Sequence, residues 1–500
     1  MNETGKTIAK NASVMMLSQI LTWGMALVFM FFVPRKVGAV GMGQLQLAAA
    51  LWGIVDIVVS FGMDTFLTKE IARAPEKVNE LLSASVVLRM LLFIPGVVGL
   101  GLYTKQAGYP DTTVMIIILI GISSFIGQLT SAFKAALNGL ERMEYVSIAG
   151  IMGNGVSTLL SIIFLFMGYG VAAVALFSTF GNLVNMSIGY LGLRRVQDLH
   201  FQKFDWSLAR LILKSSYPFL IMNGFLVFYM QVDVIIISLL ISEKQVGWYG
   251  SADRLFGTLL FIPLVYMTAV FPALSRMQAS ASDLSTKLTR LSFDLLNLVA
   301  VPIGLGLLVI ANQLVVLVFG ADFTESGPVL MVFGIVLILT YQNLLVGMSL
   351  IAADRQKPWT RIIITAALLS IPLDLVFIPW CQQAFGNGAI GGALAFVVTE
   401  AFMLTAGIYL LPKGTLNQAN LSYALRTVLA GLIMLASIWW LRDIFIVIPI
   451  VVGAAVYLVS IFILGLLTPE MRNIIRLTVA KIKQRLGLAK SQLAVDNPTK

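Results

Sequence analysis

The stretch YMQVDVIIISLLI, Tyr229 to Ile241, decides the fold. It closes an apolar run that begins near Tyr217, and the run is long enough to cross a bilayer, which takes about 20 helical residues. One carboxylate, that of Asp233, interrupts the run. A charge at the centre of a membrane helix costs at least roughly 2.5–3.5 kcal/mol. Asp233 is therefore expected to face a partner or water, which makes it a candidate functional residue.

The rest of the chain repeats this apolar pattern. Of its 500 residues, 58% are hydrophobic and 12% are charged, and the mean hydropathy is +0.92. Soluble domains carry about twice that charged fraction. The runs are continuous rather than alternating, which predicts an all-α integral membrane protein with about 14 transmembrane helices. The predicted spans cover, approximately, residues 12–33, 44–61, 83–103, 112–133, 145–167, 171–193, 217–241, 248–271, 288–311, 328–351, 359–380, 388–410, 423–441 and 445–467.

The Lys and Arg residues of the loops predict the orientation. An even number of spans places both termini on one side of the membrane, and most of the 34 Lys and Arg residues fall on that side. Because cytoplasmic loops carry an excess of cations, we expect both termini in the cytoplasm and the protein in the cell membrane. The pI of about 9.6 reflects this bias rather than nucleic-acid binding. The exceptions are Arg89, inside a span, and on the outer side Arg35, Lys36, Lys105, Lys244, Arg254 and Arg442.

Cofactor chemistry finds little support in the sequence. A single cysteine, Cys381, excludes an internal disulfide, and a single histidine, His200, leaves no plausible metal cluster. A glycine-rich phosphate loop with its lysine is missing as well. We therefore expect no cofactor, no metal, no catalytic residues and no ATP-driven step carried out by this chain.

Two pairs of short motifs indicate an internal repeat. GYGVAAVAL (residues 168–176) matches GNGAIGGAL (386–394), and AVGMGQ (39–44) resembles QVGWYG (245–250). These matches pair the sixth predicted span with the twelfth and the second with the eighth. They predict two six-helix lobes in parallel repeat, and two such bundles enclose a cleft at the middle of the bilayer. The expected units are an N-terminal lobe (1–200), a C-terminal lobe (201–411), two added spans (412–468) and a basic cytoplasmic tail (469–500).

Several longer stretches carry a family resemblance, through their order and spacing rather than through one motif. The chain resembles the polysaccharide transporter branch of the multidrug/oligosaccharidyl-lipid/polysaccharide exporters, which are lipid-linked oligosaccharide flippases of the O-antigen and teichoic-acid type. The resemblance covers most of the chain. The stretches are SFGMDTFLTKEIAR, KFDWSLARLILKSSYPFLI, LVFGADFTESGPVLMVFG, AADRQKPWTRIII and, most strongly, QVDVIIISLLISEKQVGWYGSADRLFGTLLFIPLVYMTAVFPALSRM.

The resemblance implies a mechanism and a substrate. Two lobes would rock around a central cavity, through which a headgroup crosses while its lipid tail stays in or near the bilayer. The last two spans form a groove for the tail in some members. The implied partners are a lipid-pyrophosphate-linked oligosaccharide and membrane lipids. We expect a monomer, and contact with polysaccharide polymerase machinery stays open.

Polar residues inside the predicted spans are the candidates for ion coupling or for the cavity wall. Tyr229 lies four residues before Asp233 and so shares its helix face. In the repeat register Asn182 corresponds to Glu400. Each carboxylate could instead pair with a neighbouring helix in a purely structural role. The candidates are Asp56, Asp233, Asp374, Glu400, Asn182 and Tyr229.

Two arginines are the candidates for binding the anionic headgroup. Arg254 stands where the resembled family usually has a basic residue, and Arg89 lies within a predicted span. Alternatives exist for both. Arg89 is close enough to the end of its span to extend to the membrane surface. Arg254 follows Asp253 directly, and the two could form a local interfacial pair.

The energy source follows from the expected charge of the cargo. A lipid pyrophosphate of about −2 moves outward downhill, by roughly 2.3 kcal/mol per charge per 100 mV. A carboxylate that takes up H⁺ or Na⁺ could then reset the carrier. Two alternatives remain. A multidrug or metabolite cation antiporter of the same superfamily would need a mainly acidic and aromatic pocket. A membrane glycosyl-polymerase would need a large outer loop, which this chain lacks.

Overall fold

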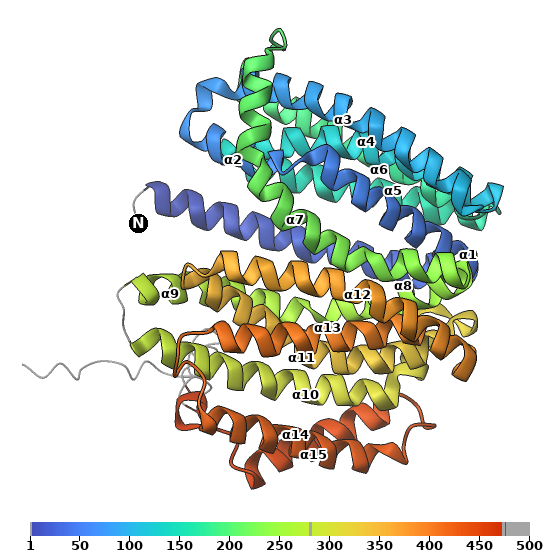
Figure 1. The fold of residues 1–500 in the computed structure, drawn as a ribbon, viewed down its shortest axis with the longest axis vertical. Coiled ribbons are helices and arrows are strands. Elements are labelled where there is room, and N and C mark those ends of the chain that lie inside the picture. The colour runs from blue at the N-terminus through green and yellow to red at the C-terminus, as the bar shows by residue number, and fades with distance from the viewer. Residues whose placement is uncertain (1–2, 280–282, 473–475, 477–500) are drawn as a thin grey trace, which may run out of the picture.

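The computed structural model describes residues 3–279, 283–472 and 476, and these residues form helices without a strand (Figure 1). The predicted tail lies outside them except for residues 469–472 and 476. Short 3₁₀ turns stand at Pro75–Lys77 and Ala321–Phe323. The α-helices are α1 (Glu3–Ser60), α2 (Met63–Arg73), α3 (Val78–Ala107), α4 (Asp111–Gly139), α5 (Met143–Phe166), α6 (Gly170–Val196), α7 (Trp206–Leu240), α8 (Glu243–Leu259), α9 (Phe261–Ala279), α10 (Asp283–Phe319), α11 (Ser326–Ala352), α12 (Gln356–Phe385), α13 (Ala389–Leu410), α14 (Gln418–Trp439) and α15 (Val447–Ile463).

The all-α membrane fold is confirmed. Within the described residues, twelve helical segments are long and apolar enough to cross a bilayer, and α15 is a shorter apolar helix. The first of these segments, Ser18–Ser60, contains two predicted spans joined at Gly38. One predicted span is shared by α8 and α9, which lie in the single segment Glu243–Met277. About fourteen spans therefore account for the architecture.

Gly38 reverses the direction of α1. Its backbone has φ 69° and ψ −179°, a region that is essentially restricted to glycine. Pro34, one turn earlier, also removes a helical hydrogen bond. As a result the first part of α1 crosses the molecule and the second part returns, as Figure 1 shows. We call the end of the bundle that holds Gly38, Glu243 and Asp322 the Gly38 end.

The two halves of the chain meet along α1 and α7. In Figure 1, α3 to α6 lie on one side of these two helices and α8 to α13 on the other. The start of α7 belongs to the first half, because Ala209 and Ile212 are buried in a cluster with residues of α2, α3 and α4. Its N-cap Asp205 accepts hydrogen bonds from Ser207, which hold the pKa of that carboxyl below its ordinary value. The predicted boundary at residues 200/201 stays a prediction.

The last two helices are attached to α10. A buried cluster joins Val309 of α10 to Met434 of α14 and Ile461 of α15. The Tyr457 hydroxyl donates to the Leu298 carbonyl at 2.9 Å, which adds a polar tie within the bilayer region. Figure 1 shows α14 and α15 at the edge of the molecule farthest from α3. They therefore extend the second half without contributing to the contact between the halves.

Replacing Gly38 by alanine should destabilise the protein, because an L side chain is strained at this φ and ψ by about 1–3 kcal/mol. The new Cβ would also stand 3.0 Å from Asp322 Oδ2. The measurement is thermal unfolding in detergent. Gly99→Ala is the matched control, because a Cβ there meets no atom within 4 Å. Equal melting temperatures for Gly38→Ala and the parent would contradict the assignment of strain.

Candidate functional site

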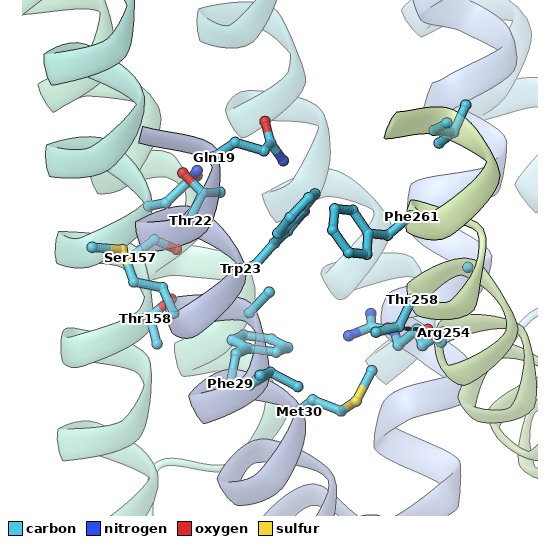
Figure 2. A pocket seen from close by; sticks show the side chains of 16 residues that line it. Gln19, Thr22, Trp23, Phe29, Met30, Ser157, Thr158, Arg254, Thr258 and Phe261 are labelled. Carbon is cyan, nitrogen blue, oxygen red and sulfur yellow. Dashed lines mark hydrogen bonds between the residues drawn. The ribbon is translucent and has the colours of Figure 1, made fainter. Parts of the chain in front are cut away.

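A cavity of about 770 Å³ lies between the two halves (Figure 2). The first part of α1 and helix α5 form one wall, and α8 and α9 form the other. Such a volume is within the usual range of small-molecule sites, and the position between two bundles is a common one. The cavity is therefore the candidate site.

The α1 and α5 wall carries polar side chains at helical spacing, beside apolar ones such as Met25 and Phe29. Gln19 and Thr22 come from α1, and Asn154, Ser157 and Thr158 come from α5. Hydroxyl and amide groups can both donate and accept hydrogen bonds, so this wall suits an uncharged ligand with many hydroxyls. None of these five residues was among the candidates predicted from the sequence. The signal that could have revealed them is the i, i+3, i+4 spacing of polar residues within an apolar span.

Arg254 is the single charged residue among those that line the cavity. Its guanidinium carbon lies 5.6 Å from the centre of the Phe29 ring, on the opposite half of the protein. Within the described residues, no carboxylate forms an ion pair with it, not even its neighbour Asp253. Arginine binds phosphate and carboxylate groups in a planar, bidentate geometry. Among the described lining residues, Arg254 is thus the cation that the cavity offers to an anionic ligand, without a direct ion pair but in the field of the adjacent Asp253.

The second candidate arginine, Arg89, does not line the cavity. Its side chain is fully buried between α2, α3 and α4, and its Nη2 donates to Asp64 Oδ1 at 2.6 Å. Its other donors reach Ser85, Gln128 and Ser131. A buried guanidinium with every group paired holds helices together, because each lost partner would leave a desolvated donor. Arg89 therefore neither reaches the surface nor has a free donor for a ligand.

Asp233 and Asp374 lie beside each other inside the second half, away from the cavity lining. The Tyr249 hydroxyl of α8 donates to Asp233 Oδ2. Asp374 is completely buried, and in the described part of the chain neither of its oxygens receives a hydrogen bond from a hydroxyl, an amide or a cation. Two buried carboxyls side by side cannot both stay ionised without a cation. This pair is an incomplete polar site between α7, α8 and α12.

Glu400 has a full set of partners. It accepts hydrogen bonds from Tyr229 at 3.1 Å, Thr340 at 2.8 Å and Asn343 at 2.9 Å. Tyr229 also contacts Thr399. The network joins α7, α11 and α13 within the second half, and Glu400 is 3% exposed. The prediction that Glu400, Tyr229 and Asp233 form a wall of the central cavity is wrong, because all three are buried in helix contacts inside the second half and do not line the cavity.

The polar candidates of the first half bond to α4. Asp56 accepts from the Ser124 hydroxyl at 2.5 Å, and the Asn182 amide donates to the carbonyl and hydroxyl of Ser123 at 3.0 Å. Neither residue lines the cavity. Asn182 and Glu400, which the repeat register relates, thus have different kinds of partners, and the register stays a prediction.

Direct hydrogen bonds join the halves at the Gly38 end. The Ala39 N–H donates to Asp322 Oδ2 at 2.6 Å, and the Arg35 guanidinium donates to the Leu317 carbonyl at 2.5 Å. Glu243 accepts from Gln44 at 3.1 Å and from the Thr113 hydroxyl. These contacts lie between α1 or α4 on one side and α8, the end of α10 or the α10–α11 connection on the other.

Two glycines allow the halves to touch there. A Cβ on Gly43 would stand 1.7 Å from the Glu243 carbonyl oxygen, and one on Gly247 would stand 1.9 Å from the Ala39 carbonyl oxygen. Backbone therefore meets backbone, as in membrane helices that pack through small residues. The cavity is closed toward the Gly38 end by this contact and by the hydrogen bonds around it.

Comparison with solved structures identifies the fold. Lipid II flippase MurJ in an inward closed conformation superposes with a TM-score of 0.71 over 93% of this chain and all of that one, at 16% identity. An inward-facing multidrug resistance MATE family transporter of the MOP superfamily gives 0.56 over 83% of this chain and 94% of that one, also at 16% identity. At these identities the likeness concerns the fold.

Comparison of sequences agrees with the fold. A protein of Haloferax volcanii named "Probable low-salt glycan biosynthesis flippase Agl15" is 24% identical over 411 residues, which are 78% of this chain and 81% of that protein. The family described as polysaccharide biosynthesis protein matches residues 8–278, more than half of the chain. This multi-pass membrane protein belongs to the polysaccharide biosynthesis protein family.

Proposed function

We propose that this protein is a flippase that carries a lipid-pyrophosphate-linked oligosaccharide from the cytoplasmic to the outer leaflet by alternating access. The observation that carries the proposal is Arg254, which has no ion-pair partner among the described residues and faces a mainly apolar cavity that also presents hydroxyl and amide side chains and is closed at the Gly38 end. Family membership and the name of the Haloferax relative support it.

The lining of the cavity favours this cargo over a cation. Arg254 would hold a phosphate, and the amides and hydroxyls of α1 and α5 would bond to sugar hydroxyls. A cation antiporter would need a carboxylate facing its substrate, and among the described lining residues there is none. An apolar groove of about 320 Å³, lined by residues of α14 and α15 such as Ile433 and Val459, would suit the lipid tail.

The direction of transport follows from the orientation that the loop cations predict. With the Gly38 end outside, the contacts at Gly43 and Gly247 form the outer closure, and the cavity would load from the cytoplasm. Outward movement of a pyrophosphate is electrically downhill by roughly 2.3 kcal/mol per charge per 100 mV. One chain encloses the whole cavity, which is consistent with a monomer as the working unit.

The pair Asp233 and Asp374 would couple transport to H⁺ or Na⁺. One proton or one cation relieves the repulsion of two adjacent buried carboxylates. Tyr249, which donates to Asp233, is on the same helix as Arg254, so a change at the pair can reach the cavity through α8. Coupling roles for Asp56, Asn182, Tyr229 and Glu400 stay predictions, because their hydrogen bonds also tie helices within one half.

Replacing Arg254 by alanine should lower the initial rate of flipping about tenfold or more, because a hydrogen bond to a charged group contributes about 1.5–3 kcal/mol. The measurement uses proteoliposomes with a fluorescent polyprenyl-pyrophosphate-linked oligosaccharide. Arg254→Lys should retain part of the rate, since it keeps the charge but not the bidentate geometry. Arg361→Ala, which removes an exposed cation of α12, is the control. A parental rate in Arg254→Ala would refute the headgroup role.

The double variant Asp233→Asn/Asp374→Asn should flip its substrate under a membrane potential without responding to an imposed H⁺ or Na⁺ gradient. The physical reason is that the pair can no longer exchange a cation. The same proteoliposomes, with each gradient imposed in turn, provide the measurement. Asp205→Asn, an exposed carboxylate at the start of α7, should respond as the parent does. An unaltered gradient response in the double variant would show that coupling resides elsewhere.

Replacing Gly43 by alanine should open the Gly38 end, because the new Cβ cannot share space with the Glu243 carbonyl oxygen. The reporter is Gln46→Cys, one turn further along α1, in a Cys381→Ser background. A membrane-impermeant maleimide added outside should label it several-fold faster. Gly53→Ala is the matched control on the same helix, where the nearest atom is 3.9 Å away. Equal labelling rates for both alanine variants would show that the glycine contact does not seal this end.

A further inference from the structure

One aromatic contact crosses the cavity between the two halves. Trp23 of α1 and Phe261 of α9 meet edge to face, with ring centres 4.4 Å apart and planes at 73°. Both rings line the cavity, and Figure 2 shows them facing each other across it. This contact is chemically unlike the hydrogen-bonded closure at the Gly38 end.

The aromatic contact lies on the far side of Arg254 from the Gly38 end. Phe261 follows Arg254 by about two helical turns, and Trp23 precedes Phe29, the ring under the guanidinium, by nearly two turns. Each step is about 10 Å along a helix. In Figure 2 the pair accordingly lies apart from Phe29, Met30 and Arg254. Arg254 and Trp23 thus line the same cavity at two different levels along its helices.

The surroundings of Trp23 have the chemistry of a sugar-binding site. Gln19, one turn earlier on α1, lies on the same side of that helix as the Trp23 ring in Figure 2, and Thr22, Ser157 and Thr158 line the same cavity on the other side of α1. Within the described residues, the indole N–H of Trp23 donates to no acceptor and is available to a ligand. A pyranose ring presents a face of weakly positive C–H groups, which the negative face of an indole attracts, and hydroxyls at its rim. The Trp23 ring can therefore stack on the apolar face of a sugar, and its N–H and the polar side chains of the cavity can bond to the sugar hydroxyls.

We propose that Trp23 is the platform of a sugar subsite, distinct from the phosphate subsite at Arg254, and that Phe261 covers this platform until a sugar displaces it. The inference rests on the proposed function and adds specificity to it. The aromatic contact is then the inner closure of the cavity. It is made of two side chains that can rotate apart, whereas backbone forms the outer closure.

The first experiment compares two probes in proteoliposomes: polyprenyl pyrophosphate, and the same lipid carrying a disaccharide. Trp23→Ala should raise the KM for the disaccharide probe about tenfold and leave the KM for the sugar-free probe unchanged. Trp23→Tyr should restore most of the affinity. This variant also shows that the loss in Trp23→Ala does not result from misfolding. Arg254→Ala should impair both probes. An equal effect of Trp23→Ala on both probes would overturn the sugar subsite while leaving the flippase proposal intact.

The second experiment needs no substrate. Thr258→Cys, one turn from Phe261 on the Arg254 side, reports access to the cavity in a Cys381→Ser background. In inside-out vesicles, Phe261→Ala should accelerate its labelling by a membrane-impermeant maleimide several-fold. Ile262→Ala, the adjacent residue, which does not line the cavity, should not. Unchanged labelling in Phe261→Ala would refute the inner closure, whatever the flipping assay shows.

Discussion

The contact of α1 with α8 at Gly43 and Gly247 is the constraint on which the rest of the structure depends. Backbone atoms of the two halves occupy the space that a single methyl group would need. Hydrogen bonds at Ala39 and Gln44 then align around this contact. Because the halves are pinned at one end, the helices diverge from it, and the cavity occupies the space between them. The cavity is therefore closed at one end because of helix packing, and the charged residues in it do not cause that difference between its two ends.

The charged residues inside the membrane region fall into two groups, those with a full set of hydrogen-bond partners and those without one. Arg89 is buried with a carboxylate and three other groups, and Glu400 is buried with three donors. Such groups stabilise only while their sets are complete. Arg254 and the pair Asp233 and Asp374 lack that completeness within the described residues. A buried charge that lacks partners can gain free energy by binding a mobile ion or an anionic headgroup.

Helix α8 connects the two incomplete sites. It places Tyr249 against Asp233 on one face and Arg254 toward the cavity on another, little more than one turn apart. The same helix carries Gly247, which meets α1. Small shifts of α8 would therefore act on the closure at the Gly38 end, on Arg254 and on the acidic pair together, because a packed helix moves largely as a rigid unit.

Hydropathy by itself determined the fold class, the approximate spans and the polar candidates inside them. A bilayer imposes the length of each run, and a charged residue within a run stands out because its cost is high. Tertiary structure alone decided the roles of those residues. Arg89 and Arg254 are both headgroup candidates on sequence; Asp64 on α2 pairs Arg89, whereas Arg254 lines the cavity without an ion pair among the described residues. Trp23 is one aromatic residue in an apolar run, and it becomes part of a site only because α9, far along the chain, brings Phe261 against it. Side-chain partners depend on distances between helices, and a linear pattern does not contain those distances.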